Sequence, residues 1–315
     1  MSLPIAIILI LVGLAVLIVG ADALVLGAAQ LAKRLGLSPF AIGVTVVAFG
    51  TSAPELFASV GAALQNVTDL AIGNVVGSNI ANIILILGVS ALVSTIPINK
   101  RVRFVEIPIM VAITALTTIL LIDHELARLE GALLVVGLLA FVLYVVKSHK
   151  EDILHEADDK IHNPKPLWID LVYITAGVAG LALGAKVLVE GAQSVAISAG
   201  VPEGVVGATI VAFGTSVPEL VTTIRAAVKK HTDMAVGNIV GSNIFNLLSV
   251  LGITSLIKPL TMDTQMDFHV LFMLGVALGF MIWTLLRPRI AKPGAILFLL
   301  LYTGYVVYAY SPQSA

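Results

Sequence analysis

Long runs of apolar residues alternate with short polar connections along the whole 315-residue chain. An α-helix needs about 20 apolar residues to cross the roughly 30 Å hydrocarbon layer of a membrane, and each run is long enough to do so. The pattern therefore predicts an all-α polytopic membrane protein with ten transmembrane helices. The predicted spans are 5–33, 39–64, 71–96, 104–122, 127–146, 167–195, 203–228, 235–256, 269–286 and 293–310.

One connection, residues 148–166, is longer and more charged than the others and is expected to form an aqueous linker. It separates a first half, 1–147, from a second half, 167–315, and each half holds five predicted spans. None of the connections is long enough for a nucleotide-binding domain. The first span lacks the positively charged start of a secretory signal peptide, so we interpret it as membrane-spanning.

Basic residues are distributed unequally between the two sets of alternating connections. With the N-terminus outside, the cytoplasmic connections carry 15 Lys and Arg, whereas the outer ones carry only Arg128 and Lys258. Lys and Arg near the ends of spans favour the cytoplasmic side. The asymmetry therefore predicts that both termini lie outside and that the 148–166 linker is cytoplasmic.

Composition agrees with a membrane protein in contact with lipid and excludes several function classes. Charged residues make up 12% of the chain and hydrophobic residues 58%, whereas a soluble domain has about 25% charged residues. A net charge of −1 without a long basic run argues against a nucleic-acid partner. The sequence has no Cys, which excludes disulfides, cysteine-based zinc sites and thiol catalysis.

The two halves share a long internal repeat. Residues 43–88 align without a gap with residues 207–252, at an offset of 164, and 26 of the 46 positions are identical. The same offset pairs Gly20 with Gly184, so the duplication extends into the first and sixth spans. Because each unit has an odd number of spans, the second copy enters the membrane from the opposite side. Two inverted repeats favour alternating access, since exchanging their conformations moves the opening to the other side.

The second span of each half contains the motif GTSxPE, which begins at Gly50 and again at Gly214. Its proline, Pro54 or Pro218, cannot donate an amide hydrogen bond and is expected to free the carbonyl of the glycine four residues earlier. The hydroxyls and the carboxylate are three or four positions apart, so they share one helical face. These polar residues are Thr51, Ser52 and Glu55 in the first copy, and Thr215, Ser216 and Glu219 in the second.

A carboxylate inside a membrane needs a compensating partner, because a charged side chain at the centre of a span costs roughly 2.5–3.5 kcal/mol. Lys186 lies within a predicted span, but its nearest acidic residue is Glu190, one helical turn away, with which it is expected to form an ion pair. Glu55 and Glu219 are therefore expected to bind a cation or to be protonated.

The third span of each half carries a second motif, GNxVGSNIxN. Asn74, Ser78 and Asn82 recur every four residues and form a polar stripe. We expect Ser78 and Asn82 to face the same cavity as Glu55, whereas Asn74 and Asn79 could serve helix–helix hydrogen bonds alone. The counterparts in the second copy are Asn238, Ser242, Asn243 and Asn246.

The donor atoms in these motifs are all oxygen. Without His or Cys they exclude a soft transition-metal site and suit alkali ions or Ca²⁺, which takes about six to eight oxygens. Two carboxylates match the charge of one Ca²⁺, and freed carbonyls, water or the amides of Asn82 and Asn246 can complete its shell. Mg²⁺ fits less well because it demands a rigid octahedral shell.

The two motifs, their duplication and the ten-span layout together resemble the calcium/cation antiporter superfamily, and within it the sodium/calcium exchanger branch and its prokaryotic relatives. The resemblance covers nearly the whole chain. It implies a secondary-active antiporter, and not an enzyme, that exchanges Ca²⁺ for Na⁺ at a central site. It also implies a monomer without a cofactor, in the plasma (inner) membrane of a prokaryote.

The resemblance further implies particular ligands. Glu55 and Glu219 would bind Ca²⁺, and the backbone oxygens of Ala48 and Ala212 would join the site. The first and sixth spans would slide against the remaining helices to switch access. The Na⁺ ligands implied are Thr51, Ser52, Thr215, Ser216, Ser78 and Ser242.

Some members of that family carry Asp where this chain has Asn246, so the cavity here would hold two carboxylates and not three. The coupling ion and the stoichiometry therefore stay open, and a Ca²⁺/H⁺ antiporter on the same scaffold is the main alternative. A cation channel would use similar carboxylates but would conduct without a counter-ion. An intramembrane hydrolase is disfavoured because the sequence lacks HExxH and GxSxG.

Several polar residues outside the motifs are further candidates for a function. The linker holds three histidines, beginning with His149, that could form a regulatory metal site, although a solvated charged segment is the simpler interpretation. Asp22 aligns with Lys186 at the repeat offset, which suggests a pairing or gating role. Asp69 and Asp233 precede the third and eighth spans and are expected to cap those helices.

Overall fold

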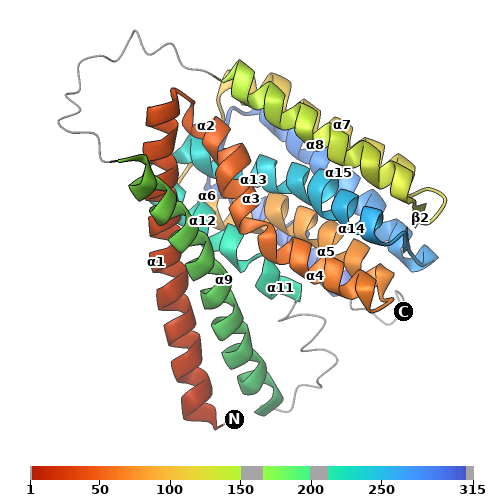
Figure 1. Ribbon diagram of the computed structural model, residues 1–315, viewed down its shortest axis with the longest axis horizontal. Coiled ribbons are helices and arrows are strands. Elements are labelled where there is room, and N and C mark those ends of the chain that lie inside the picture. Colours follow the sequence, from red (N-terminus) through yellow and green to blue (C-terminus); the bar gives the residue numbers. More distant parts are fainter. Residues whose placement is uncertain (1, 150–165, 199–211, 310–315) are drawn as a thin grey trace.

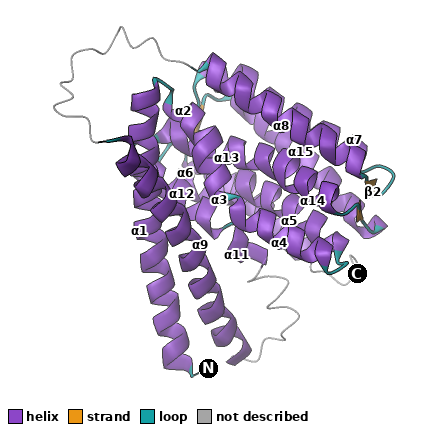
Figure 2. Cartoon of the chain, viewed as in Figure 1, coloured by secondary structure: helices purple, strands orange, loops and turns teal. Residues whose placement is uncertain are grey.

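The computed structural model describes residues 2–149, 166–198 and 212–309, and these are almost entirely helical (Figure 2). In the first half the helices are α1 (Leu3–Leu35), α2 (Pro39–Ile42), α3 (Ala48–Thr51), α4 (Ala53–Leu64), α5 (Thr68–Ile80), α6 (Leu87–Val93), α7 (Ile107–Leu120) and α8 (Arg128–Ser148), with π-helical turns η1 (Gly43–Val47), η2 (Ala81–Ile86) and η3 (Val102–Glu106). In the second half they are α9 (Leu167–Ser198), α11 (Ala212–Thr215), α12 (Val217–Val228), α13 (Thr232–Phe245), α14 (Gly252–Ile257), α15 (Asp267–Leu286) and α16 (Lys292–Ala309), with the π-helical turn η6 (Asn246–Leu251) and the 3₁₀ turn η7 (Thr264–Met266).

The number of membrane spans agrees with the predicted pattern as far as the described residues extend. Eight described helical segments are long and apolar enough to cross a membrane, and the bent pair 39–51 and 53–64 makes a ninth. The predicted span 203–228 lies partly outside the described residues, which include its second part as α11 and α12. A helical integral membrane protein is thus confirmed, and the count of ten spans stays a prediction.

The two motif-bearing segments form the centre of the molecule. The run from α5 through η2 to α6 and its counterpart from α13 through η6 to α14 are the most buried of the candidate spans. Helices α7, α8, α15 and α16 pack around them, and the first three are labelled in Figure 1. Many apolar side chains of these helices are exposed, as expected for surfaces that face lipid.

α1 and α9 are the longest helices and lie side by side (Figure 1). Glycines let their backbones approach: a Cβ on Gly13 would lie 2.6 Å from the backbone nitrogen of Leu188, and one on Gly177 would lie 2.6 Å from that of Leu24. Gly13 and Gly177, and likewise Leu24 and Leu188, are 164 residues apart, so each contact repeats the other with the halves exchanged. Such close contacts stabilise helix pairs in membranes through van der Waals packing.

Two short antiparallel strand pairs also join the halves. Strand β1 (Ile96–Pro97) pairs with β4 (Arg289–Ile290), so that Ile96 lies opposite Ile290, and β2 (Glu125–Leu126) pairs with β3 (Leu260–Thr261), so that Leu126 lies opposite Leu260. The offset of 164 converts the first pair into the second. Every strand pair in the described residues therefore links one half to the other.

The segments that carry GTSxPE are broken within the motif. α3 ends at Thr51 and α4 begins at Ala53, and the axes of the segment Pro39–Thr51 and of α4 differ by 42°. Pro54 lies in the first turn of α4, where a missing amide hydrogen is harmless because first-turn amides lack an intrahelical partner. In the second half the break lies at Ser216, before α12. The prolines thus mark the breaks, and a serine lies at each joint.

Candidate ion-binding site

Two buried carboxylates lie at the centre of the molecule, and each is contacted by the other half. The Ser216 hydroxyl donates to Oε1 of Glu55 across 3.2 Å, and the Ser52 hydroxyl donates to Oε1 of Glu219 across 3.0 Å. Both carboxylates are almost completely buried. The sequence predicted that each serine shares a face with the glutamate of its own motif, but the hydrogen bonds of the two serines run between motifs. Spacing along one helix does not reveal this crossing, because it depends on how the two copies meet.

The motif threonines make a second pair of exchanged contacts. Thr51 donates to Oδ1 of Asn238 at 3.2 Å, and Thr215 donates to Oδ1 of Asn74 at 3.3 Å. The amide of Asn74 also donates to the backbone carbonyl of Glu55 at 3.2 Å. Asn74 and Asn238 therefore form helix–helix hydrogen bonds that fix the broken segments beside the carboxylates.

The polar stripe on α5 reaches this cluster through Ser78. Its Oγ lies 3.1 Å from Oγ of Ser216, which contacts Glu55, so the structure brings Ser78 close to this carboxylate. Asn79 lies on another face: its Oδ1 accepts from Asn246 at 3.2 Å, and its amide lies 3.6 Å from Sδ of Met273. Asn79 thus makes the helix–helix contacts anticipated for it.

Several buried oxygens at the centre have no hydrogen-bond partner within the described part of the chain. Buried polar atoms are normally paired, so a concentration of unpaired oxygens indicates a place for a missing partner. Carboxylate, amide and hydroxyl oxygens are the donors that Ca²⁺ and alkali ions accept. The residues present therefore fit a hard cation. The atoms are Oε2 of Glu55, Oε2 of Glu219, Oδ1 of Asn82, Oδ1 of Asn246 and Oγ of Ser242.

The donor set combines charged and neutral oxygens. Within the described residues no group of three or more His, Cys, Asp or Glu side chains could hold a metal by itself. A cation at the centre would therefore be held by two carboxylates together with hydroxyls and amides. This arrangement favours a transported ion over a permanently bound one, because tight resident sites use more charged ligands.

Of the two alanines predicted as backbone ligands, Ala48 has a carbonyl that already lies within hydrogen-bond distance of its own motif. The carbonyl of Ala48 already accepts from the Ser52 amide at 2.9 Å and from the Thr51 hydroxyl at 3.3 Å. A carbonyl oxygen has two lone pairs, and the single Thr51 proton can go to Oδ1 of Asn238 instead, so an ion could share this carbonyl with the Ser52 amide. Ala212 begins α11, directly after residues that are not described.

Two cavities lie beside the cluster. An apolar groove of about 720 Å³ runs between the α3–α4 segment and α9 and reaches Thr215. Its lining includes Pro54 and Phe57 on α4 and Val178 and Lys186 on α9. A smaller cavity of about 190 Å³ is lined by Ser52 and by residues of α4 and η6.

The predicted helix caps are wrong. α5 begins at Thr68 and α13 at Thr232, so Asp69 and Asp233 lie within the first turn, and neither helix has a side-chain cap. Oδ1 of Asp69 instead accepts from the backbone amide of Asp263 at 2.7 Å. The helices start two residues earlier than caps at these aspartates would require, because each aspartate and the threonine before it already adopt the helical conformation.

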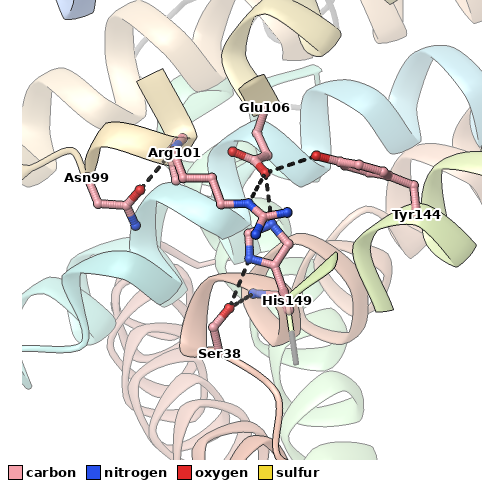
Figure 3. Close-up of polar contacts among 8 residues, drawn as sticks. Ser38, Asn99, Arg101, Glu106, Tyr144 and His149 are labelled. Atoms are coloured by element: carbon pink, nitrogen blue, oxygen red, sulfur yellow. Dashed lines mark hydrogen bonds and ion pairs between the residues drawn. The ribbon is translucent and has the colours of Figure 1, made fainter. Parts of the chain in front are cut away.

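A separate ionic cluster anchors the start of the linker (Figure 3). Oε1 of the buried Glu106 lies 2.8 Å from Nε2 of His149, 3.2 Å from Nε of Arg101 and 3.5 Å from the Tyr144 hydroxyl. Nδ1 of His149 lies 3.2 Å from the Ser38 hydroxyl. His149 therefore serves a structural contact, which does not support its part in a regulatory metal site. The other two linker histidines lie outside the described residues.

The fold is that of a helical integral membrane protein with two buried carboxylates at its centre. The family model described as "Sodium/calcium exchanger protein" matches residues 5–147 and 169–311, two stretches whose starts are separated by the same 164 residues as the repeat. The chain therefore belongs to the sodium/calcium exchanger family, a family of cation antiporters.

Individual relatives match over almost the full length. The chain is 38% identical to the "Putative antiporter CaxA" of Alkalimonas amylolytica over 96% of this chain and 97% of that protein. It is 31% identical to the "Sodium/calcium exchanger MaX1" of Methanosarcina acetivorans, over 95% and 97%. A solved structure of the sodium-calcium exchanger NCX_Mj, soaked with zero Na⁺ and Ca²⁺, superposes with a TM-score of 0.86 at 30% identity, covering 98% of this chain and 99% of that one.

Proposed function

We propose that this protein exchanges Ca²⁺ for Na⁺ across the membrane by alternating access at the Glu55–Glu219 site. The observation that carries the proposal is the pair of buried carboxylates, each held by a serine of the opposite repeat and each with one oxygen left without a partner in the described structure. The hydroxyl and amide oxygens around them would hold a monovalent ion such as Na⁺. The names of MaX1 and NCX_Mj support the same pair of ions.

The proposed ligands follow the distribution of charge. Glu55 and Glu219 bind Ca²⁺, because two carboxylates balance its charge and offer up to four oxygens. Na⁺ competes for the same carboxylates with the help of neutral oxygens, so the two ions displace one another. The proposed neutral donors are the hydroxyls of Thr51, Ser52, Thr215, Ser216, Ser78 and Ser242, the amides of Asn82 and Asn246, and the carbonyls of Ala48 and Ala212.

The proposed topology is ten spans in two inverted halves, 1–147 and 167–315, with the linker 148–166 in the cytoplasm and both termini outside. The exchanged contacts between α1 and α9 and between the strand pairs support two halves related by a pseudo-two-fold axis. The distribution of Lys and Arg supports the orientation. Each monomer contains a complete site, and the bacterial relatives favour the inner membrane.

The first test is Ca²⁺ uptake into proteoliposomes loaded with Na⁺. We expect an outward Na⁺ gradient to drive uptake of radioactive Ca²⁺ in the wild type, and Glu55→Gln and Glu219→Gln each to reduce it at least a hundredfold, because each removes a charge that balances Ca²⁺. Glu125→Gln, which alters an exposed carboxylate on β2, serves as the matched control and should leave uptake unchanged.

The same preparation separates the two coupling ions. Uptake driven by a pH gradient in the absence of Na⁺, with no response to Na⁺, would replace Na⁺ by H⁺ as the coupling ion. Ca²⁺ uptake that needs no counter-ion would indicate a channel. Normal uptake by both glutamate variants would refute the proposed site whichever ion is coupled.

A further inference from the structure

α1 and α9 are counterparts in the repeat, yet they contact their surroundings differently. α1 packs along α12. α9 makes at most slight contact with α4, the counterpart of α12, in the described residues, and the apolar groove lies between α9 and the α3–α4 segment. The molecule is therefore closed along α12 and open along α4, although the two sides derive from the same repeat.

A cluster of three charges joins α1 to α12 on the closed side. Oδ1 of Asp22 lies 2.7 Å from Nε of Arg225, and Oδ2 lies 2.6 Å from Nη2, so the guanidinium binds the carboxylate with two hydrogen bonds. Nζ of Lys229 lies 2.9 Å from Oδ1 of the same carboxylate. Each side chain is about one-third exposed. Paired hydrogen bonds between Arg and a carboxylate fix geometry as well as charge.

Along α4 the described residues show no equivalent of this cluster. The counterpart of Asp22 is Lys186 on α9, and the counterparts of Arg225 and Lys229 are Gly61 on α4 and Gln65 directly after it. Lys186 instead lies 4.0 Å from Glu190 on its own helix, and both side chains are exposed. If α9 closed onto α4 as α1 closes onto α12, Lys186 would meet no carboxylate at these two positions.

We propose that Asp22, Arg225 and Lys229 form a latch that holds α1 against α12 and favours the state whose groove along α4 is open. The inference rests on the proposed alternating access, in which opening along α12 requires α1 to leave that helix. Each cycle must then break the latch on one side without forming another on the opposite side. The duplicated scaffold is thus biased toward one of its two states, which in the proposed orientation is the state closed to the cytoplasm.

These three residues are positioning residues, because they act on the helix contact and do not touch the ion site. Their effect can be measured without transport. The sequence has no Cys, so a single introduced cysteine is the only thiol that can react with a labelling reagent. Val25 is fully buried and lies one helical turn from Asp22 on the same face of α1. In a Val25→Cys variant, we expect the rate of reaction with N-ethylmaleimide to rise when this face of α1 separates from its neighbours, as it does when α1 leaves α12.

Asp22→Asn in the Val25→Cys background should raise this rate about two- to fivefold, the range expected for partly exposed ion pairs. Asp22→Glu keeps the charge and should hold the rate near that of the parent. Glu190→Gln removes the acid of the exposed pair on α9 and serves as the matched control, with no expected change. A reporter at the buried core residue Ala71, as Ala71→Cys, should stay unreactive throughout.

An unchanged rate after Asp22→Asn would overturn the latch, as would an equal rise in the Ala71→Cys reporter, because that would reflect general loosening. Purified protein in detergent suffices, with neither Na⁺ nor Ca²⁺ flux required. Failure of the latch therefore leaves the uptake experiment unaffected, and failure of Na⁺-driven uptake does not alter the labelling rates.

Discussion

Ser216 lies at the joint before α12 and contacts both a carboxylate of the opposite repeat and the hydroxyl of Ser78. Ser216→Ala removes a hydrogen bond to a charged group, worth about 1.5 kcal/mol, and one proposed Na⁺ ligand. We expect the Na⁺ concentration for half-maximal Ca²⁺ uptake to rise about tenfold, with a smaller change in the maximal rate. The Na⁺ dependence of uptake in proteoliposomes measures this.

The matched control is Ser90→Ala, which removes another buried hydroxyl, one without a hydrogen-bond partner in the described structure. Its Na⁺ dependence should equal that of the wild type. If Ser216→Ala also behaved as wild type, Ser216 would not be a Na⁺ ligand, and the hydroxyl would serve packing between the repeats alone.

At the residue scale the sequence predicted which side chains gather at the centre but not how they pair. Ser52 and Glu219 are 167 positions apart, and spacing along one helix contains no information about a contact over that distance. The duplication did contain a signal, because identical polar motifs in two related halves commonly meet at the axis between them. The caps at Asp69 and Asp233 failed because each aspartate and the threonine before it already adopt the helical conformation.

At the scale of helices, close packing depends on small residues, and the contact between α1 and α9 depends on glycine. In Gly177→Ala the new Cβ would lie 2.6 Å from the backbone nitrogen of Leu24, a distance that forces the helices apart. Overpacking of this kind typically destabilises by about 1–3 kcal/mol. We expect a lower midpoint of thermal unfolding in detergent, followed by circular dichroism.

Gly279→Ala provides the comparison for this prediction, because a Cβ there meets nothing within 4 Å. Ala is the better helix former by about 1 kcal/mol, so this variant should unfold at the same temperature or slightly higher. Equal midpoints for both variants would mean that α1 and α9 tolerate separation.

At the element scale, hydrophobic runs and prolines predicted the spans and the breaks in the motif-bearing helices. They did not predict the π-helical turns η2 and η6, at the ends of the polar stripes that contain Asn82 and Asn246. Such turns insert one extra residue and depend on packing against neighbours, which the sequence pattern does not express.

The whole molecule has a predicted orientation that single cysteines can test in cells. An impermeant maleimide applied to intact spheroplasts should label a Ser2→Cys variant and leave an Asp158→Cys variant in the linker unlabelled, because the first terminus faces outward and the linker faces the cytoplasm. Permeabilised spheroplasts should label both. Labelling of Asp158→Cys in intact spheroplasts would reverse the proposed topology.

At this scale the alternation of spans follows from hydrophobic length, and the duplication follows from identity between the halves, whereas the cytoplasmic linker and the inverted orientation stay predictions. The difference between the α12 side and the α4 side could not be predicted from the sequence. It depends on which charged residues Asp22 and Lys186 contact in the folded protein.

The strand pairs have a consequence for how such a protein could have arisen. β1 needs β4 and β2 needs β3, so neither half completes its own backbone hydrogen bonding. In the proposed inverted arrangement, the strands of a single-copy ancestor could pair only with those of a second chain inserted upside down in the same bilayer. Fusion of the two genes would then have fixed a ratio of one to one between orientations that insertion alone could not guarantee.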